Sequence, residues 1–227
     1  MNIFRAILFI AIGFVSHPTT AVESTYTAAI LGGSFDADLG RPLSLSQPMG
    51  LYLRSSLSEA GISATPYAFG GASLEGLEKQ YQQYRTDVVY VGHAADLVYL
   101  GLTGEALSRP SEFLEWAQKV TKELLEEGTI VVVSSYPRTG CFSQEVLSDL
   151  DFSANWNEMV SAYETFMQLA GAIVVRPFER MVPLTYRTNN DGDPSQYYDG
   201  FHPDNGSARA AAYVVSAAMI SALNQRD

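Results

Sequence analysis

Apolar residues fall into two alternating patterns along most of the chain. One pattern is a set of five short runs, rich in β-branched and other apolar residues, that are typical of strands buried on both faces of a parallel sheet. These runs cover residues 27–32, 64–69, 87–92, 129–134 and 172–176. The pattern therefore predicts five strands in a parallel sheet.

Segments with helical spacing lie between these runs. Residues 112–127 and 155–170 each carry apolar side chains on one face and end at a glycine, and the second places Tyr163 and Phe166 on that face. Three weaker or shorter helical segments cover residues 48–60, 74–84 and 206–223. Strands that alternate with helices predict a three-layer α/β domain with right-handed crossovers.

The first 21 residues have the pattern of a secretory signal peptide. Arg5 gives a positive start, residues 6–15 form an apolar run, and residues 16–21 are polar and end in a small residue. The run is too short to predict a transmembrane helix, and a buried N-terminal strand or helix is the alternative. We expect an exported chain, secreted or periplasmic, whose single domain covers residues 22–227 and has no stable membrane insertion.

Charge and residue counts limit which partners and which kinds of site the chain can have. The chain has 14 Lys and Arg against 25 Asp and Glu, a formal net charge of −11, which argues against nucleic acid as a partner. One cysteine cannot form an internal disulfide or a Cys-rich zinc site. Removal of the signal segment takes His17 with it, so His93 and His202 would be the two remaining imidazoles.

Two glycine-rich stretches follow predicted strands, where ligands bind in open parallel sheets. The stretch GGSFD begins at Gly32 and places Ser34 in a sharp turn that could expose a nucleophilic hydroxyl. In FGGAS, which begins at Phe69, paired glycines let backbone N–H groups approach a ligand, and Ser73 could cap a helix. The alternative for both is an ordinary turn.

Two further segments carry imidazoles. Asp199 and His202 are three residues apart, so the carboxylate could hold one ring nitrogen and leave the other free as a base. The alternative is a solvated Asp beside an unrelated surface His. His93 follows the run 87–92 and fits a structural donor as well as a functional group, and Asp96 fits a helix cap.

The order of these segments resembles the SGNH (GDSL-type) hydrolases. Residues 30–34 (ILGGS) match the family's first block, Gly71 the glycine of the second, Gly92 the start of the third, and residues 199–202 the last. The resemblance implies a flavodoxin-like α/β/α sandwich. It also implies Ser34 as nucleophile, His202 as base and acid, Asp199 as its orienter, and the Ser34 and Gly71 N–H groups as the oxyanion hole.

Two positions depart from the family pattern. Gly33 stands where the family has the Asp before its nucleophile, and Ala94 aligns with the Asn of the third block that donates to the oxyanion. Loss of one such donor typically costs on the order of 10²–10³ in rate. His93 is the candidate replacement donor.

The sequence therefore predicts a serine esterase that cleaves an acyl ester of a carbohydrate or a lipid, with no cofactor and no metal. An O-acyltransferase with the same triad and a catalytically weak glycan-binding protein are the alternatives. Tyr197, Tyr198 and Phe201 offer faces for a sugar ring or an acyl chain.

Two other features raise the questions of a cysteine nucleophile and of a calcium site. Cys141, after the fourth predicted strand, is a packed residue, a free thiol or the nucleophile of a Cys–His pair. Residues 189–193 (NNDGD) resemble a fragment of a calcium loop, but the spacing of the full motif is missing and a polar turn is the better interpretation.

Overall fold

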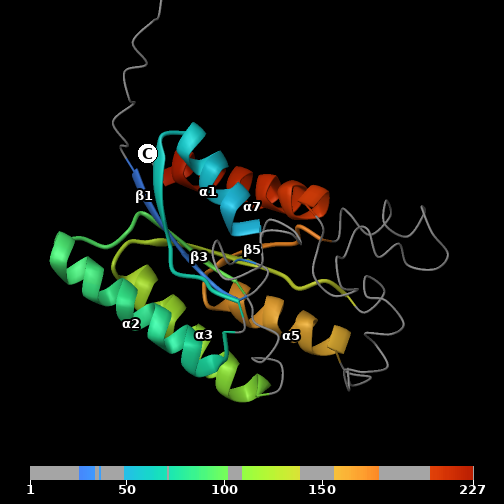
Figure 1. Cartoon of the computed structure of the whole chain (residues 1–227). Helices are drawn as coiled ribbons and strands as arrows, with labels where there is room; N and C mark the ends of the chain where they lie inside the picture. Colours follow the sequence, from blue (N-terminus) through green and yellow to red (C-terminus); the bar gives the residue numbers. More distant parts are fainter. Residues whose placement is uncertain are drawn as a thin grey trace, which may run out of the picture.

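A computed structural model describes residues 26–33, 36, 49–70, 72–101, 109–138, 156–178 and 205–226. Its strands form one parallel sheet with the order β2-β1-β3-β4-β5 (Figure 1). The strands are β1 (Tyr26–Leu31), β2 (Ile62–Pro66), β3 (Leu97–Leu100), β4 (Ile130–Ser134) and β5 (Ile173–Val175). This order is that of the flavodoxin-like folds, so the predicted fold class is confirmed.

Helices cover both faces of the sheet. In Figure 1, α1 and α7 lie together on one side, and α2, α3 and α5 lie on the other. The helices are α1 (Met49–Glu59), α2 (Leu74–Val91), α3 (Pro110–Glu126), α5 (Trp156–Leu169) and α7 (Asn205–Arg226). The predicted three layers are thus present, and Ser73 caps α2 as expected by accepting from the Gly76 N–H.

The central strands are level at their carboxyl ends. Leu31 pairs with Leu100, and Leu100 with Val133, so β1, β3 and β4 end side by side. Their side chains are almost wholly buried, which explains the continuous apolar runs in the sequence. Whatever follows these three strands meets at one edge of the sheet.

The prediction of a third strand at residues 87–92 is wrong. Residues 87–92 form the last turns of α2, which ends at Gly92 with φ 89°, and the true third strand is β3, residues 97–100. Val89 and Tyr90 are 80% and 93% exposed, and Val88 is the apolar side chain of this run that packs against the core. The helical spacing of the buried Tyr81 and Tyr84 continues through this run, and that periodicity outweighs the strand propensity of the valines.

The amino-terminal edge of the sheet is held by Asp96, immediately before β3. Its carboxylate accepts from the Thr27 N–H at 2.9 Å and from Arg226 of α7 at 2.7 Å. Burial alone would raise the pKa of Asp96, but the hydrogen bonds from Arg226 and Thr27 outweigh it and lower the pKa. Asp96 therefore ties the end of α7 to the sheet and does not cap a helix.

Among the described helices, α7 is long and apolar enough to cross a membrane by length and composition alone. Core helices meet the same criteria, and one side of α7 packs against α1 and strands β4 and β5. The buried side chains on that side are Ala208, Ala211, Ala212, Val215, Met219 and Leu223. Within this fold, α7 is a core helix.

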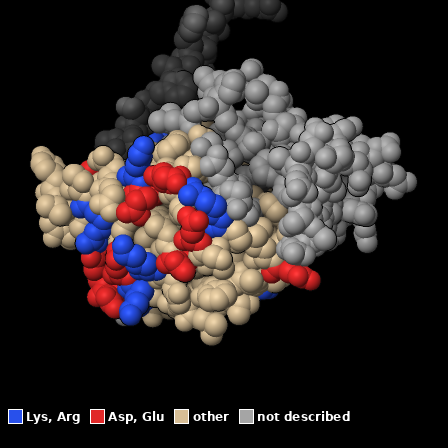
Figure 2. All heavy atoms as spheres, turned by 90° about the horizontal axis from the view of Figure 1, so that it is seen from below, with Lys and Arg blue, Asp and Glu red and all other residues tan. Residues whose placement is uncertain are grey.

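The layer of α2 and α3 carries charges of both signs. Figure 2 shows basic and acidic side chains interleaved on this face. Arg85 pairs with Glu127 across the two helices at 2.5 Å, and Arg109 pairs with Glu75 at 2.7 Å. No single-sign patch builds up there, although the chain as a whole is acidic.

Candidate active site

The order of the strands reverses direction between β1 and β3, and ligands of open α/β sheets bind beside such a switch point. Gly32 follows β1 and Gly101 follows β3 at this place. The Gly101 N–H donates to the Leu31 carbonyl at 2.8 Å, which holds the two strand ends together. The candidate site is built on this junction.

Asp36 fills the space between these two glycines. A Cβ on Gly32 would lie 2.3 Å from the Asp36 Oδ2 atom, and one on Gly101 would lie 1.9 Å from it. Either distance is a severe overlap, so the carboxyl group fits because both neighbours lack a side chain. Asp36 is 2% exposed.

Asp36 also closes a tight turn with Gly33. Its N–H donates to the Gly33 carbonyl at 3.0 Å, as in a β-turn, and its Oδ2 accepts from the Gly33 N–H at 3.3 Å. Positions 34 and 35 lie between the two ends of this turn in the sequence. The predicted nucleophile, Ser34, is therefore bonded covalently to a residue whose N–H and C=O are both held by Asp36.

A buried chain of hydrogen bonds anchors the carboxyl group to the sheet. The Tyr99 hydroxyl of β3 donates to Asp36 Oδ1 at 2.6 Å and lies 2.6 Å from the Ser134 hydroxyl of β4. Burial raises the pKa of Asp36 to about 7, against the lowering effect of the hydrogen bonds from Tyr99 and Gly33. Burial and the Asp36 charge raise the pKa of Tyr99 well above its ordinary value, so the phenol stays protonated.

Gln80 of α2 holds the other side of the junction. Its Oε1 accepts from the Gly32 N–H at 2.9 Å, and its Nε2 donates to the Gly32 carbonyl at 2.9 Å. Both residues are buried, so these bonds satisfy two backbone groups that the sheet leaves unpaired. The end of β1 is thus fixed from α2 as well as from β3.

A second polar cluster lies at the ends of β4 and β5. Glu164 of α5 is 3% exposed and pairs with Arg138 at 3.1 Å and with Arg176 at 2.7 Å. The Ser135 hydroxyl also donates to Glu164. Glu164 thus joins two guanidinium groups and a serine hydroxyl at the carboxyl edge of the sheet.

Most predicted site residues lie outside the described residues. These are Ser34, Gly71, Asp199, His202, Tyr197, Tyr198, Phe201 and Cys141. Their immediate neighbours Gly33 and Gly70 are described, and the segment after β2 is tied to β1 because the Ile30 carbonyl accepts from the Tyr67 and Ala68 N–H groups. The roles assigned to the eight residues remain predictions.

His93 lies at the opposite edge of the sheet. It follows the end of α2 and precedes β3, is exposed, and has its Nδ1 atom 3.1 Å from the Ala94 carbonyl oxygen. A strand of four to six residues spans about 13–20 Å, so His93 is not beside Gly33. The same correction applies to Gly92: the glycine at the carboxyl end of β3 is Gly101, because residues 87–92 are helical.

Three of the supporting residues were missed from sequence. Gln80 and Glu164 lie among the buried residues of α2 and α5, and a polar residue on the apolar face of a predicted helix is the signal that could have marked them. Asp36 is part of the quoted GGSFD stretch, but its burial depends on Gly101, which is far away in the sequence.

Solved structures with known descriptions share this fold. A GDSL-like lipase from Bacteroides thetaiotaomicron has a TM-score of 0.60 at 10% identity, over 87% of this chain and 89% of that one. An SGNH hydrolase candidate from Slackia heliotrinireducens has a TM-score of 0.61 at 19% identity, over 86% and 98% of the two chains. The chain has the SGNH-hydrolase fold. An acetylxylan esterase from Geobacillus stearothermophilus has a TM-score of 0.61 at 12% identity, over 89% and 96%.

No protein-family model matches the chain, and no curated protein matches it. The likeness is therefore one of structure, and it confirms the resemblance to SGNH hydrolases at the level of the fold. In this SGNH-hydrolase fold, the Gly33–Asp36 turn follows the first strand at the switch point.

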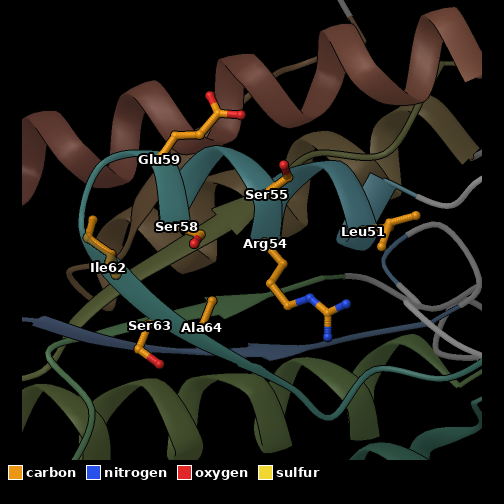
Figure 3. Close-up of a pocket in the computed structure, with 8 residues that line it drawn as sticks. All are labelled: Leu51, Arg54, Ser55, Ser58, Glu59, Ile62, Ser63 and Ala64. Carbon is orange, nitrogen blue, oxygen red and sulfur yellow. The ribbon is translucent and has the colours of Figure 1, made fainter. Parts of the chain in front are cut away.

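Away from this junction, a shallow pocket lies between α1 and the edge strand β2 (Figure 3). In Figure 3, Arg54 extends from α1 toward the sheet. The residues that line the pocket are Leu51, Arg54, Ser55, Ser58, Glu59, Ile62, Ser63 and Ala64. It holds none of the predicted site residues.

Within the described ranges, no three His, Cys, Asp or Glu side chains gather in a way that could hold a metal ion. The segment 189–193, singled out in the sequence, lies outside those ranges.

Proposed function

We propose that the chain is a member of the SGNH hydrolases, a secreted or periplasmic serine esterase that cleaves an acyl ester of a carbohydrate or a lipid. The observation that carries the proposal is the Gly33–Asp36 turn, fixed at the switch point of an SGNH-hydrolase fold, with Ser34 in its sequence. The fold neighbours described as an acetylxylan esterase and a GDSL-like lipase support this substrate class.

In the proposed reaction, the Ser34 hydroxyl attacks the ester carbonyl carbon while His202 takes its proton. The Ser34 and Gly71 N–H groups hold the oxyanion of the tetrahedral intermediate. As the C–O bond breaks, His202 gives the proton to the leaving alcohol and an acyl-serine remains. Water then repeats the sequence with His202 as base and releases the acid, while Asp199 holds the imidazole in place.

Because the third strand is β3 and not residues 87–92, the third block of the family aligns with a different part of this sequence. If Gly101 opens the third block, two positions further on is Thr103, and not Ala94. We propose that the Thr103 hydroxyl takes the part of the family's Asn, because a hydroxyl can donate one hydrogen bond. This replaces His93, which lies at the other edge of the sheet.

The chain from residue 22 onward tests the proposal, with 4-nitrophenyl acetate and acetylated xylan as substrates. We expect turnover by the unmodified chain and loss of at least about 10³-fold in kcat for Ser34→Ala and for His202→Ala. Thr103→Val should cost on the order of 10²-fold. Ser58→Ala, an exposed serine on α1, is the matched control and should keep full activity.

Equal turnover by Ser34→Ala and the unmodified chain would remove Ser34 from the reaction. Turnover that depends on an added sugar alcohol, with no hydrolysis in its absence, would favour an O-acyltransferase. Binding of xylan without any turnover would favour a glycan-binding protein.

A further inference from the structure

We propose that Asp36 is the positioning residue of the nucleophile turn, where its carboxyl group holds the Gly33 amide and thereby presents the Ser34 hydroxyl in one orientation. The proposal rests on the proposed function, since it assumes that Ser34 is the nucleophile. It adds a residue that lies two positions after Ser34 and does not touch the ester itself.

The first argument is the double link between Asp36 and Gly33. One link is from backbone to backbone and the other from the Gly33 N–H to the Asp36 side chain. A β-turn needs only the first of them, and many turns lack even that. The side-chain link fixes the peptide plane before Gly33, while the backbone link fixes the carbonyl that joins Gly33 to Ser34.

The second argument is that the carboxyl group is itself fixed. Tyr99 and Ser134 connect it to two neighbouring buried strands, so the turn is anchored to the centre of the sheet. Gly32 and Gly101 lie so close to its oxygen atoms that a side chain at either position would overlap them. A side chain held in this way can transmit a fixed geometry to the turn.

The third argument comes from the other groups that face Asp36. Burial raises the pKa of the Tyr163 hydroxyl of α5, and the nearby charges of Asp36 and Glu164 raise it further. No lysine, arginine or histidine of the described ranges contributes to the electrostatics of Asp36. Among the described residues, the side chain of Asp36 therefore accepts hydrogen bonds from two neutral groups, the Tyr99 hydroxyl and the Gly33 N–H.

Four variants test this role, with the esterase assay and amide hydrogen exchange as separate measurements. Asp36→Ala removes both side-chain hydrogen bonds of this residue, the one from the Gly33 N–H and the one from the Tyr99 hydroxyl. Asp36→Asn keeps the volume, with one donor for Tyr99 and one acceptor for the Gly33 N–H. Tyr99→Phe removes the anchor, and Asp87→Asn, an acid-to-amide change on α2 outside the site, is the control.

We expect Asp36→Ala to lower kcat by about 10²-fold with KM within about threefold, since misplacement of a reacting group acts on the chemical step. Asp36→Asn should restore kcat to within about fivefold, and Tyr99→Phe should lie between. Exchange of the Gly33 amide should become at least about tenfold faster in Asp36→Ala and stay unchanged in Asp36→Asn, while the Gly32 amide, which donates to Gln80, should change little in either variant.

The outcomes separate this inference from the proposed function. Wild-type kcat and wild-type exchange in Asp36→Ala, or an Asn variant as slow as the Ala variant, would overturn the positioning role while Ser34→Ala still abolishes activity. If Ser34→Ala is as active as the unmodified chain, the proposed function fails and amide exchange alone decides whether Asp36 holds the turn. If Asp36→Ala does not fold, Tyr99→Phe decides: a tenfold lower kcat supports the role and an unchanged kcat overturns it.

Discussion

Gln80 uses both ends of its side-chain amide on one residue, Gly32, accepting from its N–H and donating to its carbonyl oxygen. Gln80→Leu keeps much of the volume but leaves two buried backbone groups without a partner. An unsatisfied buried group costs about 1–3 kcal/mol, so we expect a loss of roughly 2–4 kcal/mol in the free energy of unfolding. Urea unfolding measures it, with Gln82→Leu on the exposed side of α2 as control. Equal losses in the two variants would contradict the prediction.

Asp36 makes stability depend on pH in an unusual direction for a carboxyl group. Its pKa is raised from 3.8 to about 7 in the folded chain. Below about pH 4 the group is protonated in both states. Between about pH 4 and 7 the unfolded chain releases the proton while the folded chain keeps it, so folding is progressively disfavoured, and above about pH 7 the loss is constant.

Asp36→Asn cannot ionise and serves as the reference for this effect. We expect the free energy of unfolding of the unmodified chain to fall relative to Asp36→Asn by roughly 4 kcal/mol between pH 4 and pH 8. Urea unfolding at several pH values measures the difference, in which the other titrating groups largely cancel. A constant difference across this range would show that the Asp36 pKa is not raised.

Gly101 and Asp36 should be energetically coupled. A Cβ at position 101 would overlap the Asp36 carboxyl group, so Gly101→Ala should cost about 1–3 kcal/mol. In an Asp36→Ala background the overlapping atoms are gone and the cost should largely disappear, giving an interaction free energy of about 1 kcal/mol or more. Gly70→Ala, where nothing lies within 4 Å of the added Cβ, is the control for a glycine change alone. Additive losses would contradict the overlap.

Glu164 should contribute more to stability than a carboxylate of the surface pairs. Glu164→Gln leaves Arg138 and Arg176 without a shared counter-charge in a site where Glu164 is 3% exposed. Breaking a buried pair costs about 3–5 kcal/mol, and the partial exposure of the arginines reduces this to roughly 2–3 kcal/mol. Glu127→Gln, which breaks the surface pair with Arg85, should cost no more than about 1 kcal/mol. Thermal unfolding of both variants compares them, and equal losses would show that the cluster is solvated.

Most of the sheet could be predicted from the sequence because its central strands, β1, β3 and β4, are buried on both faces and most of the helices end near glycines. The exception was the run 87–92, which forms the end of α2 with Val89 and Val91 exposed, while the true third strand is only four residues long. Phe166 is a second exception. It was expected on the buried face of α5 and is 44% exposed, whereas Glu164 is buried there. An arginine pair from two other segments makes that burial possible, and no local pattern contains this information.

The turn at Ser34 was recognised from its glycines, but its support was not. Tyr99 reaches Asp36 across 63 residues of sequence, and Gln80 reaches Gly32 across 48. Whether a carboxyl group between two glycines is solvated or buried depends on which strand ends beside it. That neighbour was misassigned when residues 87–92 were taken as the third strand, and so His93 was placed at the wrong edge.

The two edge strands of the sheet affect whether copies of the chain aggregate at high concentration. An exposed strand edge is a template for edge-to-edge aggregation. On one side, β2 ends in Pro66, which has no N–H, and the charged Arg54 and Glu59 line the pocket beside it. On the other side, β5 offers only three residues. Neither border of the described sheet gives a neighbouring molecule a long, flat ladder to extend, so we expect this architecture to resist intermolecular sheet formation even when its net charge is screened by salt.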